Sequence, residues 1–124
     1  MNVYVVSNPA MPGLVKIGRS IDVEARLAQL SNVTAVPLPF ILEFVDATDG
    51  EVCEVERLAH QLLAEHRINP CREFFRASVS QAISAVQTAA LISAWNMADR
   101  EAREDFLAQI DVSVFDRTSA GRAA

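Results

Sequence analysis

The stretch LVKIG at residues 14–18 decides the fold, because it has the composition and length of a short strand. It follows the segment NPAMPG at residues 8–13, in which two prolines and a glycine indicate a loop. Before that loop stands VYVV at residues 3–6, a β-branched and aromatic run that also favours a strand. Together the three pieces predict a hairpin of two strands.

Side chains alternate along a strand, so the hairpin also predicts which residues face the core. Four alternate apolar residues are expected there: Val3, Val5, Val15 and Ile17. Tyr4 and Lys16 point the other way, and we expect them on the same side as each other.

Two helices and a third strand are predicted after the hairpin. Residues 21–31 have helical periodicity, with Ser20 as the N-cap. The buried stripe of that helix is expected to be Val23, Leu27 and Leu30. Residues 40–45 form the third strand, and a longer helix follows over residues 50–65 with Asp49 as its cap.

The last third of the chain has a helical pattern. It is rich in alanine from Ser78 onward, and a further amphipathic helix is predicted over residues 98–110. The apolar face of that helix would present Phe106, Leu107 and Ile110.

The expected fold class is α/β, more narrowly α+β: a small three-stranded antiparallel sheet flanked by helices. Residues 72–76 are predicted as a short extended or capping segment and not as a fourth strand. We expect one domain over residues 1–86, a helical C-terminal extension over 87–111 and a frayed tail over 112–124.

Composition limits the class of protein. A chain of 124 residues that is 51% apolar has the size and core of one domain. Its cysteines, Cys53 and Cys71, are too few for a disulfide framework, and we expect ordinary half-buried thiols. The sequence shows neither a signal peptide nor an apolar run of membrane-spanning length, so we expect a cytoplasmic protein without a membrane partner.

The formal net charge of −5 argues against tight non-specific DNA binding, because a protein that holds phosphates normally has a basic face. Arg67, Arg72 and Arg76 nevertheless lie within one short stretch. An acidic enzyme with a positive cleft is consistent with both observations.

Six polar residues are candidates for a site: Tyr4, Lys16, Arg26, Glu56, His60 and Glu73. Each has an ordinary structural explanation, such as packing for a strand tyrosine or solvation for a strand lysine. Glu56 and His60 stand four residues apart at one edge of the apolar stripe of their helix, a spacing that supports a metal site. Two ligands do not make a closed zinc site, and these residues alone name no reaction.

The order of the parts resembles the GIY-YIG endonuclease superfamily. The first motif stands as VYV at residues 3–5 and the second as KIG at residues 16–18. Arg26 follows eight residues after the glycine, and a third strand and a helix bearing Glu56 come next.

Further pieces resemble a sub-branch, common in bacteria and phages, that has K-I-G in place of Y-I-G. These are SNP at residues 7–9, MPGLVKIGRS at 11–20, the pair Glu56 and His60, and REFF at 72–75 with its E-F-F motif. The resemblance covers about residues 2–86.

This resemblance implies a metal-dependent hydrolase that cleaves phosphodiester bonds in DNA. It gives Tyr4 the role of positioning or deprotonating the attacking water, Arg26 the scissile phosphate, and Glu56 one Mg²⁺ or Mn²⁺ ion. A carboxylate with water suits Mg²⁺, which keeps much of its hydration shell. Substrate binding is assigned to Arg19, Glu73 and Arg76.

Three features depart from the pattern of the superfamily. The late asparagine of other branches has no clear match, although Asn69 and Glu73 are both near the right place. Lys16 replaces the second tyrosine, and it either contacts the phosphate or acts as a base. Leu30 stands where many homing-type members have a histidine, so that role is empty or is taken by His60 as a catalytic residue. We expect the Tyr4, Lys16, Arg26 and Glu56 side chains to converge on one cleft, with His60 at its rim.

Three functions remain open. The leading one is the DNA endonuclease, favoured by the joint presence of Tyr4, Arg26 and Glu56. The second is a catalytically degenerate GIY-YIG fold that binds nucleic acid or protein, favoured by the −5 charge and the missing second tyrosine. In the third, the C-terminal helices form a homo-oligomer, although their apolar faces could equally close the domain's own core.

Overall fold

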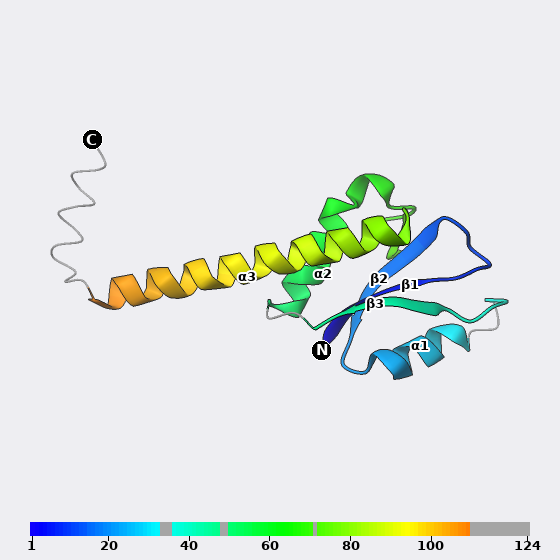
Figure 1. Ribbon diagram of the computed structural model, residues 1–124, viewed down its shortest axis with the longest axis horizontal. Coiled ribbons are helices and arrows are strands. Elements are labelled where there is room, and N and C mark those ends of the chain that lie inside the picture. The colour runs from blue at the N-terminus through cyan, green and yellow to red at the C-terminus, as the bar shows by residue number, and fades with distance from the viewer. Residues whose placement is uncertain (33–35, 48–49, 71, 110–124) are drawn as a thin grey trace. The chain divides into compact units, whose positions relative to one another are not determined.

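The computed structural model describes residues 1–32, 36–47, 50–70 and 72–109 (Figure 1). Its elements follow in the order β1 (Asn2–Ser7), β2 (Leu14–Ser20), α1 (Val23–Ser31), β3 (Ile41–Asp46), α2 (Val52–Leu62), the 3₁₀ helix η1 (Ala64–His66), β4 (Phe74–Arg76) and α3 (Val79–Gln109). The chain divides into two compact units, Met1–Ala94 and Trp95–Ala124, and every strand named above belongs to the first.

β1 and β2 form the predicted antiparallel hairpin, with Tyr4 opposite Gly18 and Val5 opposite Ile17. The loop between them includes Gly13, whose φ of 79° lies in the left-handed region that side chains disfavour. The hairpin prediction is confirmed, and both strands are slightly longer than expected.

The sheet has four antiparallel strands in the order β3-β1-β2-β4, where the sequence predicts three. The additional strand is β4, in which Phe74 stands opposite Lys16 and Phe75 opposite Val15. Three residues are too few to show alternation in a sequence, so the pattern predicts only an extended segment at this position. The pairing between β2 and β4 stops at Lys16, and beyond that residue no described strand covers the outer edge of β2.

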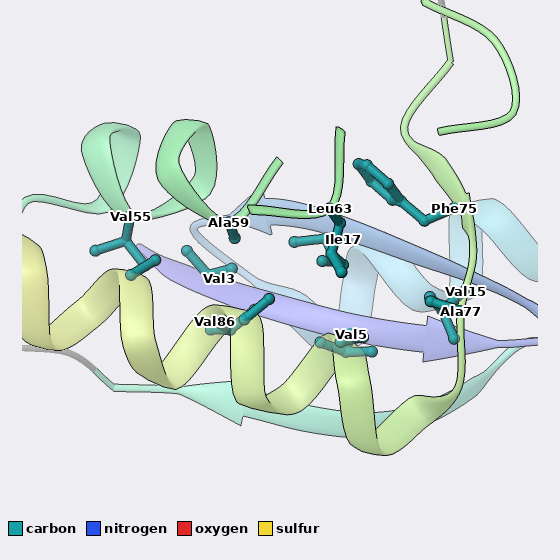
Figure 2. Close-up of a cluster of buried hydrophobic side chains, with 13 residues drawn as sticks. Val3, Val5, Val15, Ile17, Val55, Ala59, Leu63, Phe75, Ala77 and Val86 are labelled. Atoms are coloured by element: carbon teal, nitrogen blue, oxygen red, sulfur yellow. The ribbon is translucent and has the colours of Figure 1, made fainter. Parts of the chain in front are cut away.

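The main core lies on the face of the sheet that α2 and α3 cover (Figure 2). It contains the four residues that alternation assigns to the core, Val3, Val5, Val15 and Ile17. Val55 and Ala59 of α2, Val86 of α3 and Phe75 of β4 pack against them, all fully buried. The predicted core face is therefore confirmed.

The opposite face of the sheet is covered by α1 (Figure 1). Tyr4, Val6 and Phe40 are buried there. The predicted stripe of α1, formed by Val23, Leu27 and Leu30, packs on this second cluster. These residues stay partly exposed, and no residue of α1 is fully buried. A single helix of nine residues covers this face, so its apolar stripe remains open to solvent at the margins.

The helices begin later than predicted, and different residues cap them. Asp22, not Ser20, is the N-cap of α1, and its carboxylate accepts from the Ala25 N–H at 3.1 Å. Ser20 still belongs to β2. Glu51 caps α2 by accepting from two backbone N–H groups of the first turn, whereas Asp49, the predicted cap, lies outside the described residues. In each case the helix begins directly after a residue whose carboxylate accepts from the free backbone N–H groups of the first turn.

The C-terminal helical region also differs from prediction. α2 ends at Leu62 and is followed by η1, and α3 is one continuous helix where two helical segments are predicted. Ile110 lies outside the described residues. The fully buried Ser93 of α3 accepts from the Glu51 N–H at 3.0 Å and ties α3 to the start of α2. Within the described residues, none of these helices combines the length and apolarity needed to cross a membrane.

Candidate functional site

The outer edge of β2 is held at Ile17 by two other elements. The Ile17 N–H donates to the carbonyl oxygen of Glu73 at 3.4 Å, and the Ile17 carbonyl lies 2.9 Å from His60 Nε2. A carbonyl can only accept, so His60 Nε2 carries a proton, and in the neutral ring Nδ1 does not. β4 pairs with β2 only as far as Lys16, so it leaves the outward backbone N–H and carbonyl of Ile17 without a strand partner. These two groups bond instead to Glu73, the residue before β4, and to His60 of α2.

The Lys16 ammonium group pairs with the Glu73 carboxylate. Its Nζ lies 2.9 Å from Glu73 Oε2 and 5.6 Å from the centroid of the Phe74 ring. The Lys16 side chain is 10% exposed, and that of Glu73 is 41% exposed. Burial alone would raise the pKa of Glu73, but the hydrogen bond and charge of Lys16, with the charges of His60 and Arg67, hold that pKa below its ordinary value.

α2 brings Glu56 to the same edge. Its Oε1 lies 3.6 Å from Arg19 Nε, and its side chain is 15% exposed. Burial raises the pKa of Glu56 above its ordinary value, and the negative charge of Glu73 raises it further. The positive charges of His60, Arg19 and Lys16 oppose this shift without cancelling it.

Five of the sequence-predicted site residues therefore lie together, and we name them the β2-edge cluster: Lys16, Arg19, Glu56, His60 and Glu73. Each carboxylate has a cationic partner, and His60 contacts β2 close to both pairs. Such an arrangement can hold a cation at a carboxylate and an anion at the neighbouring cations.

Tyr4 reaches β2 from the other face of the sheet. It is 2% exposed and packs among the residues that α1 covers. A Cβ atom at Gly18 would lie 2.5 Å from the Tyr4 hydroxyl oxygen and 2.7 Å from Cζ, so the ring crosses directly over that glycine. The glycine of the KIG stretch is thus explained by the close approach of Tyr4. Lys16 points to the same face as Tyr4, as alternation predicts, since its ammonium group lies over Phe74 of that face.

Arg26 and Arg76 are not brought into the cluster. Arg26 is exposed on α1, and its Nη1 lies 3.5 Å from Gln29 of the same helix. Arg76 is exposed opposite Leu14, three residues along the chain from Glu73, a separation of about 10 Å in an extended strand.

Arg67 lies beside the cluster, although the sequence pattern assigns it no role at the site. Its guanidinium carbon lies 5.8 Å from the centroid of the Phe75 ring, and the His60 ring lies 5.2 Å from the same centroid. Arg67 Nε donates to the Arg72 carbonyl at 2.9 Å. The three clustered arginines of the sequence are a signal for this region, but only the β-bridge between Arg67 and Phe75 singles out the first.

Cys53 is a second residue at this site that the sequence does not predict. Its free thiol is exposed, and Arg19 Nη1 contacts its sulfur. The expectation of a half-buried thiol is wrong for Cys53, because it lies in the first turn of α2, beside the end of β2. Cys71 lies outside the described residues.

The donor set at this edge suits one kind of metal ion. Among the described residues, no group of three or more His, Cys, Asp or Glu side chains is placed to hold a metal. A closed zinc site is thus absent from this part of the chain. The partly buried Glu56 carboxylate fits an ion that keeps most of its water ligands, as Mg²⁺ does.

Comparison with curated proteins and with solved structures finds no match. The sequence pattern of the T5orf172 domain, a domain found in nuclease-like proteins of phages and bacteria, matches residues 1–90. The matched span contains the whole sheet and every residue of the β2-edge cluster. The chain belongs to the T5orf172 domain family.

Proposed function

We propose that this protein is a metal-dependent endonuclease that hydrolyses phosphodiester bonds in DNA. The observation that carries the proposal is the Glu56 carboxylate, which is 15% exposed and has cations close to it on the open edge of β2. A carboxylate that only stabilised the fold would gain more from full pairing or from solvent. The nuclease-like character of the T5orf172 domain and the resemblance to GIY-YIG endonucleases support the same function.

Glu56 would hold Mg²⁺ or Mn²⁺, and the ion would supply positive charge against the oxygens of the reacting phosphate. Arg19, whose Nε lies 3.6 Å from Glu56 Oε1, would add positive charge against the same phosphate, where charge builds in the transition state. Arg19, and not the distant Arg26, would contact the scissile phosphate, the role that the resemblance gives to Arg26.

His60 is the side chain best suited to accept a proton. Its Nε2 is fixed by the Ile17 carbonyl, which leaves Nδ1 of the neutral ring as an acceptor for a water proton. Tyr4 would help to position the attacking water, and its hydroxyl lies over Gly18 of β2, the strand that His60 contacts. Lys16 is paired with the Glu73 carboxylate, so we assign it to phosphate binding and not to proton transfer.

A binding module is the second candidate, and the burial of Tyr4 favours it. A side chain that is 2% exposed has little room to act on a water, and Lys16 is already paired. In this case the cluster would bind a phosphate without cleaving it.

Glu56→Ala separates the two candidates. With Mg²⁺ or Mn²⁺ and varied DNA substrates, the wild type should cleave, and the variant should lose a factor of about 10² or more in rate. DNA binding in EDTA should hold or strengthen, because a carboxylate facing phosphates repels them without its ion.

Glu65→Ala is the matched control, since it removes an exposed carboxylate of η1 outside the cluster and should leave the rate unchanged. Metal-dependent cleavage that is absent in the wild type on every DNA and RNA tested would favour the binding module. Equal rates for the wild type and Glu56→Ala would remove Glu56 from the mechanism.

A further inference from the structure

The Glu73 carboxylate lies beside the cationic side chains of Lys16 and Arg67 and close to His60. Lys16 donates to it at 2.9 Å. His60 and Glu73 share the backbone of Ile17, the first through its carbonyl and the second through its N–H. Arg67 is bridged to Phe75, two residues after Glu73, and attracts the same carboxylate.

Lys16, Arg67 and the neighbouring His60 are fixed in place, and the Glu73 carboxylate is not. The Lys16 side chain is almost fully buried, His60 is hydrogen-bonded to β2, and Arg67 is tied by its Nε and by the Phe75 ring. Glu73 holds its position at the edge of this group with a side chain that is 41% exposed. A solvent-accessible carboxylate on a preformed set of cations is an exchangeable partner, because another anion can take its place without reorganising the donors.

A phosphodiester fits these donors as well as a carboxylate does. Both are singly charged and present two acceptor oxygens, and lysine and arginine bind either group through charge-assisted hydrogen bonds. The cations also stand out in a molecule whose overall net charge is −5. Local positive charge on an acidic protein is where a polyanion makes its contacts.

We propose that Lys16 and Arg67 form a binding site for a second phosphodiester group of the DNA, next to the one at Glu56, and that Glu73 occupies this site in the free protein. The inference rests on the proposed action on DNA. On binding, the DNA phosphate displaces the Glu73 carboxylate from Lys16. The ordinary alternative is that Glu73 permanently anchors Lys16. The two accounts predict opposite changes in the affinity for DNA when Glu73 is neutralised.

The test measures binding of a short labelled DNA duplex in EDTA, between about 50 and 200 mM salt, so that cleavage does not enter. Glu73→Gln removes the competing charge and should bind more tightly than the wild type. Its plot of log affinity against log salt should keep the wild-type slope, because the same phosphate contact is made in both complexes once Glu73 is displaced. Glu65→Gln changes the net charge equally and should bind less tightly than Glu73→Gln.

A second pair of variants tests the cations. Arg67→Gln should weaken binding and make the slope shallower by about 0.9, and Arg57→Gln, an exposed arginine of α2, should leave the slope unchanged. Thermal unfolding in the same buffer verifies that each variant is folded. Where Glu73→Gln is unfolded, the comparison of Arg67→Gln with Arg57→Gln decides.

Binding by folded Glu73→Gln that is no tighter than that of Glu65→Gln would overturn the proposal and support the permanent anchor. Equal slopes for the two arginine variants, or no DNA binding by the wild type, would also overturn it. Because this test uses no metal and the endonuclease test measures cleavage, either proposal can fail while the other stands.

Discussion

At Glu56, burial and the neighbouring Glu73 both work against an ionised carboxylate, and the nearby cations only partly offset them. Glu73 shows the opposite balance, because Lys16 holds it in the charged form. Two carboxylates of one cluster thus have pKa values that are moved apart, an arrangement that recurs at functional sites. The physical consequence for Glu56 is a charge that the folded state accommodates poorly.

Glu56→Gln should therefore stabilise the protein in EDTA at neutral pH. The pKa of Glu56 is raised on folding, so its favourable contribution is present below the unfolded value, near 4.5, and is lost as pH rises through the folded pKa. The free energies of unfolding of wild type and variant should differ by a constant amount at acid pH, and the variant should gain as the pH rises. Denaturant titrations between pH 3 and 8, at about one-unit steps, measure this.

Glu73→Gln is the internal control, with the opposite sign. In the wild type the pKa of Glu73 is lowered on folding, so ionised Glu73 stabilises the protein at pH values above its unfolded pKa of about 4.5. That stability is lost as the pH falls through the folded pKa. The Glu73→Gln variant should be less stable than the wild type at neutral pH, by an amount that shrinks in acid and stays small because Glu73 is partly solvated. Two variants that shift stability in the same direction with pH would contradict the assignment of opposite shifts.

The contact between β1 and β2 at Tyr4 and Gly18 gives a prediction for these two elements. Gly18→Ala places a methyl group where the Tyr4 ring lies, at 2.5 Å from the hydroxyl oxygen. Tyr4 is buried and stiff, so the strands or the ring must shift, and overpacking of this kind costs about 1–3 kcal/mol. The loss should appear in the free energy of unfolding.

Tyr4→Leu provides the matched background, because it removes the atoms that the new methyl group meets. In that background Gly18→Ala should cost clearly less, which a double-mutant cycle expresses as a coupling energy between the two positions. An equal cost in both backgrounds would show that the glycine is needed for its backbone and not for the room it leaves to Tyr4.

The elements that the sequence predicts correctly are those whose own residues carry the signal. The hairpin and its core face follow from alternation at Val15 and Ile17, and the structure confirms both. β4 is different, because its three residues become a strand only by pairing with β2. No local pattern contains that information.

The candidate site divides in the same way. Arg26 is placed correctly on a helix by periodicity, but periodicity does not tell which part of β2 the helix faces. Arg19 reaches Glu56 because it follows Gly18 on β2 and α2 packs on that strand, a relation between two elements. Arg67 is positioned by its bridge to Phe75, again a non-local pairing.

For the whole molecule, the acidic balance has to be weighed against the cations of one edge. A net charge of −5 disfavours long-range attraction to DNA, so binding should depend on the few phosphate contacts made within the site and should weaken with salt in proportion to their number. This favours a protein that acts at defined DNA positions over one that coats DNA. The salt slopes proposed above measure how many phosphates are involved.

The second compact unit, which begins at Trp95, gives the last prediction. All buried members of both core clusters lie before residue 90, and Ser93, which bonds to the start of α2, lies before the unit boundary. Trp95, Phe106 and Leu107 are 75%, 62% and 53% exposed. A chain that ends at Ala94 should therefore keep its free energy of unfolding within about 0.5 kcal/mol, the range for changes outside a core, and should keep its cleavage activity. Light scattering at two concentrations completes the comparison. A mass that rises with concentration only in the full chain would place a self-association surface on residues 95–109, whereas a large loss of stability at constant mass would show that Phe106 and Leu107 belong to the core after all.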